Sequence, residues 1–517
     1  MSHFDPANIP QEKFSFAQID ERLFDKKFET KPIGYFRDAW LRFKRNKGSV
    51  VAAIIILLIV LYGLLVPFFS LYQVSDSDGK YAKMRPKSSL LMQIGIADGN
   101  YQKTLNDRFY IYLQAIGMGI MDTEGAGGIS WEDGSKAEQN PIVSLGETFK
   151  RQGRDYRIAS VDSYYEVGFQ YLNITRQELD NILAWQEESG LQVVYPMVDT
   201  ASKWCDTGNA HDANFWYRHA ANSSPVNEKG KRMDFDDVVA SGLVDNYLRD
   251  QDGNILYYAQ KDRNMIQVRV LYYNYFLYRN GYEPLHPMGT DAQGYDIMVR
   301  LAHGIRVSLL LAVSVSMINL TIGAIYGAIE GYYGGWVDLV MERVTDILSG
   351  IPFMVVATLF QLHLVIPGKV SPLVGLLYAF VLTGWISTAY RVRTQFYRFK
   401  GQEYVLAART LGARDRRIMF RHIFPNALGT IITSSVLVIP GVILTESILS
   451  YLGIVNFNSQ TTTSLGTMLG NGQGYLSTDP HIIFFPALVI SLLMLSFNLF
   501  GNGLRDAFNP SLRGAEE

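Results

Sequence analysis

The hydrophobic positions of this chain gather in six long stretches that contain no Asp, Glu, Lys or Arg. Each has at least the ~20 residues that a helix needs to cross the ~30 Å hydrocarbon core of a bilayer. A helix of a soluble protein would carry a polar stripe, and these stretches carry none. The pattern therefore predicts a polytopic α-helical membrane protein with six spans. The stretches are Ser49–Leu71, Val307–Ile329, Ile347–Gly368, Val370–Tyr390, Ile423–Thr445 and His481–Leu504. The prolines expected to kink them are Pro352, Pro440 and Pro486.

The flanks of the stretches predict how the chain crosses the membrane. Basic residues crowd the segment before the first stretch, and such residues stay on the cytoplasmic side. Six crossings then place both termini in the cytoplasm. Phe36, Trp40 and Phe43 alternate there with Arg and Lys, as in an amphipathic helix lying in the membrane interface. Residues 330–346, expected to form a cytoplasmic loop, break the charge rule because they hold four acids and one arginine.

Residues 73–286 contain no apolar stretch and are rich in Tyr, Asp, Asn and Gly. Crossing parity places them outside the cell, where we expect a folded α+β domain inserted between the first two spans. Thr175 and Glu178 have the spacing of a capping box, and Gly190 follows as a helix end. Strand-like runs occur at Tyr156–Ala159, Leu191–Tyr195 and Ile266–Tyr278, and a turn is expected at Asp252-Gly253.

Composition and motifs argue against an enzyme. The net charge of −2 gives no reason to expect nucleic acid, and Cys205 has no second cysteine with which to form a disulfide. The chain lacks the GxxxxGK[ST] phosphate loop, the HExxH and CxxC metal motifs and the GxSxG elbow of hydrolases. His211, Asp212 and His219 lie close together but are typical of surface residues. We therefore expect no catalytic residue, metal or cofactor in this chain.

The most informative segment is the basic connection at residues 391–422. It contains nine arginines and lysines but only two acidic residues, Glu403 and Asp415. Such an excess of positive charge indicates the cytoplasmic side of a membrane. Charge alone would explain its retention inside the cell without any partner. The order of small residues goes further, because Ala407 and Ala408 would let a helix pack closely and Gly412 would let the chain then turn sharply. A second short helix is expected from Asp415 onward.

The run from Glu403 to Gly412, with Pro425 beyond it, resembles the EAA loop of ABC importer permeases. In that family the loop is a pair of short helices that docks into a groove of an ATPase subunit. The resemblance assigns this coupling role to Glu403, Ala407, Ala408, Gly412, Arg416, Arg417 and Pro425. It also implies the type I importer transmembrane fold, with ATP and Mg²⁺ bound by the ATPase subunits.

A second motif precedes the second span. It comprises Gly289, Thr290, Asp291, Gly294 and Asp296. It resembles the GTDxxGRD stretch of C-type permeases in oligopeptide and dipeptide importers, with Tyr295 in place of the usual arginine. The segments 331–338 and 445–453 are similar to the same branch. Taken without the resemblance, the motif is a structural turn that leads into a helix.

The resemblance implies a permease subunit that forms half of a peptide pathway in a bacterial inner membrane. Its expected partners are a homologous B-type permease, two ABC ATPase subunits, an extracellular solute-binding protein, the peptide and membrane lipid. Nickel, glutathione or haem are alternative substrates within the family, and a receptor with an extracellular ligand-binding domain is the alternative class. Glu446 could line or gate the pathway, or could simply reach water at the interface. The expected regions are 1–48, 49–72, 73–286, 287–510 with the coupling loop 391–422, and 511–517.

Overall fold

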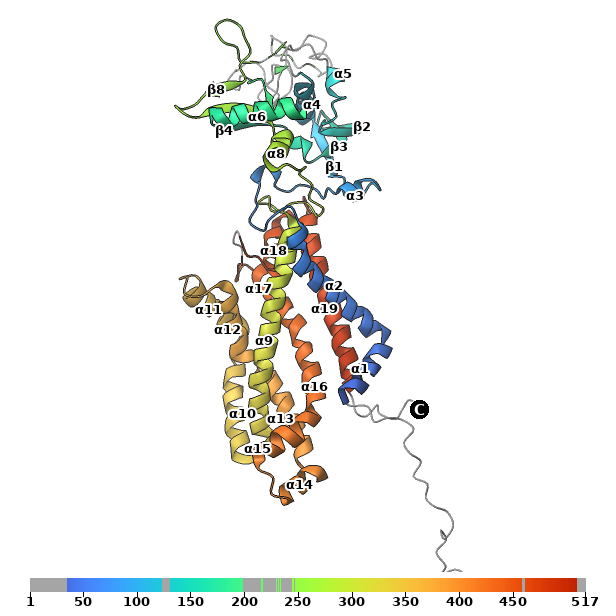
Figure 1. The fold of residues 1–517 in the computed structure, drawn as a ribbon, viewed down its shortest axis with the longest axis vertical. Coiled ribbons are helices and arrows are strands. Elements are labelled where there is room, and N and C mark those ends of the chain that lie inside the picture. Colours follow the sequence, from blue (N-terminus) through green and yellow to red (C-terminus); the bar gives the residue numbers. More distant parts are fainter. Residues whose placement is uncertain are drawn as a thin grey trace, which may run out of the picture.

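The computed structural model describes residues 35–122, 131–198, 247–457 and 461–508, together with 215–216, 229, 231, 233 and 244–245. A bundle of long helices forms one part of an elongated molecule, and a smaller part with strands and helices sits on one end of it (Figure 1). The smaller part, called the inserted domain below, lies between α2 and α9. The last helix, α19, runs away from the inserted domain and ends beside α1.

Five helices in the described residues are long and apolar enough to cross a membrane. The first is α2 (Lys47–Phe69) and the second is α9 (Ile297–Tyr333). The third joins α12 (Pro372–Gly384) to α13 (Ile386–Lys400). The fourth runs from Asp415 to Tyr451 through α15 (Asp415–Arg417), η5 (Ile418–Ile423), α16 (Phe424–Val436) and α17 (Val438–Tyr451). The fifth is α19 (His481–Phe508).

The stretch predicted as a third span, residues 347–368, is not a single helix. Its residues divide between the end of α10 (Gly335–Ser349) and α11 (Phe353–Phe360), which continues to Val365. The two parts are bent by 69° at a break that contains Pro352. At 1.5 Å per residue α10 is only about 22 Å long. The pair therefore supplies a sixth span only when both parts are counted together.

The structure also corrects the prediction of an acidic loop at residues 330–346. Only Gly334 separates the end of α9 from the start of α10, so nearly all of the expected loop is helical. Gly334 and Gly335 have φ values of +67° and +52°, a region that favours glycine. This tight reversal returns the chain along the bundle.

Close packing around α9 forms the centre of the bundle. Its small residues recur every four positions at Gly323, Gly327 and Gly331, on the side that meets α13. A Cβ at Gly327 would collide with the backbone of Ala389. Small residues at this spacing let two helices approach closely in a membrane, which explains why α9 and α13 pack along so much of their length.

The amphipathic segment before the first span forms α1 (Tyr35–Arg45). Ala39 and Phe43 are buried against Phe500 and Ala507 near the end of α19, while Trp40 stays exposed. The prediction of a helix is confirmed. Part of its apolar face, however, covers protein.

The described residues of the inserted domain form two antiparallel sheets of three or more strands. Their orders are β1 (Asn100–Asn106), β3 (Arg154–Asp162), β2 (Ile142–Arg151) and β4 (Phe169–Ile174), β9 (Ile266–Leu271), β5 (Val194–Tyr195), with β8 (Tyr258–Gln260) also paired to β9. A short pair joins β6 (Phe215–Trp216) and β7 (Val244–Asp245). The helices are α3 (Ser89–Met92), α4 (Asp107–Met121), α5 (Trp131–Gly134), α6 (Arg176–Ser189) and α8 (Tyr272–Asn280). Apolar residues of α4 pack with the first sheet and those of α6 with the second.

Several local predictions can be compared with these elements. Tyr156–Ala159 lies within β3, and Thr175 caps α6 by accepting a hydrogen bond from the Glu178 amide. Only the last two residues of 191–195 form a strand. The prediction of one strand over residues 266–278 is wrong. Strand β9 ends at Leu271, and α8 begins at Tyr272. Its aromatic side chains favour strands by propensity, yet they pack here at helical spacing into the core below the sheet.

Candidate functional site

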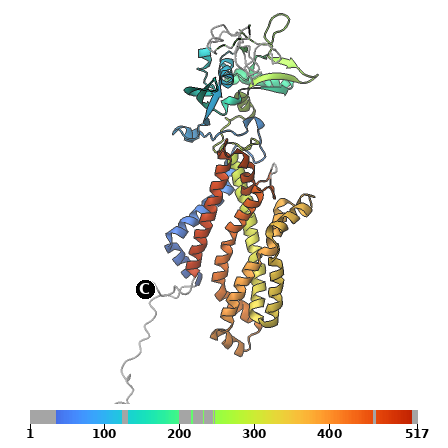
Figure 2. The ribbon, with the colours of Figure 1, turned by 180° about the vertical axis from the view of Figure 1, so that it is seen from behind.

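The basic segment 391–422 contains one separate short helix and not two. Residues up to Lys400 belong to the span α13, and α14 (Glu403–Thr410) follows after a short break. The second helix, expected from Asp415, is the beginning of the long span that continues to Tyr451. Val405 of α14 and Ile418 near the start of this span are buried in the same hydrophobic cluster. Figures 1 and 2 place α14 at the end of the bundle opposite to the inserted domain.

The two ends of α14 have the residues expected of them. Glu403 is its first residue, where a negative side chain is favoured by the helix dipole. At the other end Gly412 has φ +80° and donates its N–H to the Arg409 carbonyl, while Ala413 donates to the Ala408 carbonyl. This pair of bonds is the Schellman arrangement that ends a helix with a left-handed residue. The prediction of a sharp turn at Gly412 is confirmed.

One side chain anchors α14 and the others leave a protruding surface. Val405 is fully buried against Phe396 and Ile418. In contrast Leu411 is 88% exposed. Ala407, Arg416, Arg417 and Pro425 are also exposed, and Ala408 is half-buried. Leu406 of the same helix is also exposed, and apolar side chains that are exposed together suit contact with another protein.

Four arginines surround a hollow of about 450 Å³ beside the tip of α14. They are Arg414, Arg416, Arg417 and Arg421, and Phe420 completes the wall. The described part of the chain supplies no ion pair to any of the four. Their neighbour Asp415 accepts a hydrogen bond from the Tyr332 hydroxyl, at 2.6 Å, instead. The result is a positively charged surface with one aromatic side chain among its arginines.

An ion cluster lies at the same end of the bundle and accounts for the acids that broke the charge rule. Arg393 donates to Asp338 at 2.6 and 2.8 Å and to Glu342 at 3.0 Å, and it lies 3.5 Å from Glu330. These contacts join α13 to α9 and α10. The sequence pattern identifies Arg393 only as one basic residue among many. Its pairing is not predicted, because its partners lie more than fifty positions earlier in the sequence.

The second motif joins the start of α9 to the chain that leaves α2. Thr290 is fully buried, accepts a hydrogen bond from the Met84 amide at 2.8 Å and donates to the Tyr81 carbonyl at 2.5 Å. Gly289 and Gly294 both have positive φ, and a Cβ on either would collide with backbone carbonyls of this chain segment. The motif therefore fixes two distant segments of the sequence against each other.

The two acids of this motif complete the connection. Asp291 accepts hydrogen bonds from the amides of Gln293 and Tyr295, and burial raises the pKa of its carboxyl. Asp296 caps α9 by accepting from the Val299 amide and pairs with His286 at 2.8 Å. Tyr295, which replaces the usual arginine, stacks under the guanidinium of Arg300. All five motif residues thus serve this junction in the present chain.

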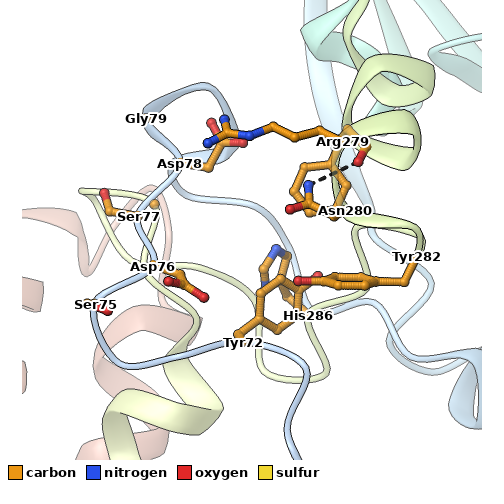
Figure 3. Close-up of a pocket in the computed structure, with 12 residues that line it drawn as sticks. Tyr72, Ser75, Asp76, Ser77, Asp78, Gly79, Arg279, Asn280, Tyr282 and His286 are labelled. Carbon is orange, nitrogen blue, oxygen red and sulfur yellow. Dashed lines mark hydrogen bonds between the residues drawn. The ribbon is translucent and has the colours of Figure 1, made fainter. Parts of the chain in front are cut away.

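A polar hollow of about 430 Å³ opens at the junction, as Figure 3 shows. The ring of Tyr72 stacks on His286 with centroids 4.3 Å apart and meets Tyr282 edge-on. In this view Arg279 and Asp78 lie at the top of the hollow, and Asp76 lies at its left. Sequence reasoning missed it because the walls come from two segments about 200 positions apart.

Glu446 lies in α17 and is buried. Its carboxylate accepts hydrogen bonds from the hydroxyls of Ser308 in α9, Ser450 in α17 and Ser464 before α18 (Leu465–Gly472). The expectation that it might simply reach water is therefore wrong. A role in the pathway stays a prediction.

Metal chemistry receives no support from the part of the chain that the structure describes, where no group of three His, Cys, Asp or Glu residues could hold an ion. Cys205, His211, Asp212 and His219 lie outside the described residues.

Comparison with known families agrees with these features. Residues 319–514 match the binding-protein-dependent transport system inner membrane component, and residues 34–86 match the N-terminal transmembrane domain of oligopeptide transport permease C. The first match covers the bundle from the middle of α9 onward, and the second covers α1, α2 and the segment fixed by Thr290. The intervening residues, which include most of the inserted domain, are matched by neither.

Two curated relatives are named as permease proteins of peptide transport systems. The chain is 42% identical over 228 residues to the oligopeptide transport system permease protein OppC of Bacillus subtilis, covering 44% of this chain and 72% of that protein. It is 40% identical over 229 residues to the dipeptide transport system permease protein DppC of the same species, covering 44% and 69%. The solved MetNI methionine ABC transporter is similar over 41% of this chain and 98% of that chain, at 17% identity and a TM-score of 0.34. The chain therefore belongs to the oligopeptide and dipeptide permease C family of ABC transporters, whose members are transmembrane transport subunits and not ATPases.

Proposed function

We propose that this chain forms half of the pathway of a bacterial importer for oligopeptides or dipeptides. A homologous B-type permease supplies the other half, two ABC ATPase subunits bind ATP and Mg²⁺, and a solute-binding protein delivers the peptide. The names of the relatives support the substrate class. In this arrangement the inserted domain lies outside the cell, and α14 and both termini lie in the cytoplasm.

The observation that carries the coupling role is the capped, protruding α14. Val405 fixes its inner face to α13 and η5, while Leu411 projects from its tip. An ATPase that grips this tip moves α13 and the span beginning at Asp415 together. Closure of the two ATPases on ATP would tilt these helices and open the pathway outward. The ATPases must bind the two conformations with different affinity, since otherwise nucleotide could not shift the equilibrium.

The charge around α14 indicates the chemistry of the docking partner. Arg414, Arg416, Arg417 and Arg421 present positive charge beside an exposed Phe420. An ATPase groove with acidic residues at its rim and an apolar floor would be complementary. We assign Arg416 and Arg417 to this contact.

Glu446 is proposed to act at the other end as a gating residue. It ties α17 to α9 and α18 through three serine hydroxyls. Rocking of α17 during transport would strain or break these bonds. A hydrogen bond within a protein is worth about 0.5–1.5 kcal/mol net, so three of them together are enough to bias the conformational equilibrium.

Replacing Leu411 by Asp tests the coupling role. The side chain is exposed, so the subunit should insert and fold, but a charge at the tip should prevent ATPase binding. We expect loss of peptide uptake and loss of ATPase subunits from the purified complex. Leu191→Asp, at an exposed site of the inserted domain, is the matched control and should retain both. Normal uptake by Leu411→Asp would disprove the role of α14.

A further inference from the structure

A finger-like loop at the base of the inserted domain has an ordered backbone. Lys87 and Asp98 pair as an antiparallel bridge, and the Ser88 amide donates to the Ala97 carbonyl at 2.9 Å. Within the loop, α3 is followed by a turn in which the Ile96 amide donates to the Leu91 carbonyl at 3.0 Å. These bonds hold residues 88–97 in one shape. We call residues 88–97 the apolar finger.

The surface of the apolar finger is unlike that of a soluble domain. It contains no charged residue, and five large apolar side chains are between 40% and 78% exposed. They are Leu90, Leu91, Met92, Ile94 and Ile96. Contiguous apolar surface of this kind marks contact with a membrane or another protein. Leu90, Leu91 and Met92 are consecutive residues of α3 and all are exposed, so their side chains point in different directions around the helix. Lipid that surrounds the finger therefore fits them better than a single flat protein surface.

The base of the finger is fixed to the end of the bundle. The ammonium of Lys87 forms a buried ion pair with Asp162 at 2.8 Å. The backbone amide of Lys87 donates a hydrogen bond to the His286 carbonyl. Two positions earlier, the Arg85 guanidinium donates to the Thr478 carbonyl and lies 3.4 Å from Asp479, just before α19. The finger is therefore held at a constant height relative to the spans.

The position of the finger identifies what surrounds it. Figures 1 and 2 both show α3 projecting sideways just beyond the end of the bundle, on the side of α2 and away from α10 to α12. On this side α2 is the span with the smallest buried share. Its last turn also exposes Phe68 and Phe69, each by more than 80%. The finger thus continues an apolar surface that faces lipid.

We propose that the apolar finger inserts into the boundary between headgroups and acyl chains of the leaflet nearest the inserted domain. Uncharged apolar side chains on a short helix suit this depth. The finger and α2 would then hold the inserted domain at a fixed tilt over the bilayer. This proposal needs only the membrane location of the bundle and does not depend on the identity of the transported substrate.

Fluorescence of the complete transport complex in nanodiscs tests the insertion. In a Cys205→Ser background, Ile94→Cys is labelled with an environment-sensitive NBD dye, and the phosphatidylcholine–phosphatidylglycerol bilayer contains a lipid with a nitroxide on its headgroup. We expect blue-shifted emission and strong quenching at residue 94. Glu188→Cys, at an exposed position of the inserted domain, is the control and should show neither effect.

A second variant separates lipid insertion from a protein contact. Leu90→Asp combined with Ile96→Asp should expel the finger and abolish quenching at residue 94, without removing the partner permease from the complex. If residue 94 is no better quenched than residue 188, the proposal is wrong. It is equally wrong if a photo-crosslinker at residue 94 captures the partner permease while the nitroxide has no effect.

Discussion

At the scale of single residues, Gly412 shows how a motif glycine can act through the backbone alone. Its φ of +80° lies in the left-handed region, yet a Cβ there would meet no atom within 4 Å. A substitution is therefore opposed by the backbone conformation and not by a steric clash. Gly401, at the other end of α14, also has open space but a φ of −92°.

This contrast gives the first prediction. Gly412→Ala should weaken the turn after α14 by about 1 kcal/mol, because Ala disfavours a left-handed conformation. Gly412→Asn should weaken it less, since Asn tolerates this region. Peptide uptake should fall in the order glycine, asparagine, alanine, whereas the matched control Gly401→Ala should transport normally. Equal loss in the two Gly412 variants would contradict a purely conformational role.

The second prediction concerns Asp291, where a motif acid sits in a partly buried turn. Because burial raises the pKa of this carboxyl, the folded protein binds its proton more tightly than the unfolded chain does. The stability it contributes is present at low pH and is lost as the pH rises from the ordinary value of 3.8 through the raised value. Asp291→Asn keeps an oxygen for the Gln293 and Tyr295 amides, so it should remain stable at neutral pH.

Thermal unfolding in detergent at several pH values measures this effect. The difference in midpoint between Asp291→Asn and the unaltered protein should favour the variant more as the pH rises. Asp252→Asn, in an exposed turn, should show a flat difference. A variant that loses stability at neutral pH would show that the charge of Asp291 is needed.

At the scale of elements, the sequence predicts helices well where each can be identified from its own residues. The ends of α2 and α19 lie within a few positions of the predicted apolar stretches, and Thr175 and Gly412 identify helix ends by local rules. The predictions that are wrong concern residues whose contact partners lie far away in the sequence. The acidic residues of α10 favour a loop when only the local sequence is considered. Their partner Arg393 belongs to another helix, so the sequence does not show that they are paired.

The third prediction tests this pairing. Arg393→Met removes the charged partner of Asp338, whose side chain is 13% exposed, and of the more exposed Glu342. The loss should cost about 2 kcal/mol of stability, between the values for exposed and for buried ion pairs. The thermal midpoint in detergent should fall, and adding Asp338→Asn to the same chain should restore part of the loss. Arg343→Met removes an exposed arginine of α10 and should change little. Full additivity of the two substitutions would contradict a direct interaction.

At the scale of the whole molecule, α9 connects the two functional ends. Its 37 residues extend about 55 Å as one helix. One end is capped by Asp296 within the junction, and the other places Tyr332 against Asp415 beside the arginine hollow. The hydrogen bonds of Thr290 also fix the segment leaving α2 to this helix. No sequence pattern predicts this connection, because it depends on which segments meet in space.

This continuity predicts that the inserted domain moves with α9 as one rigid body during transport. Spin labels at Glu188→Cys and Met317→Cys, in a Cys205→Ser background, should give a narrow distance distribution that is the same without nucleotide and after vanadate trapping. Asp296→Ala removes the cap of α9 and the partner of His286, so it should broaden the distribution. Asp252→Ala, far from the junction, should leave it narrow. A distance that shifts on trapping while the junction is intact would mean that the inserted domain swings independently of α9.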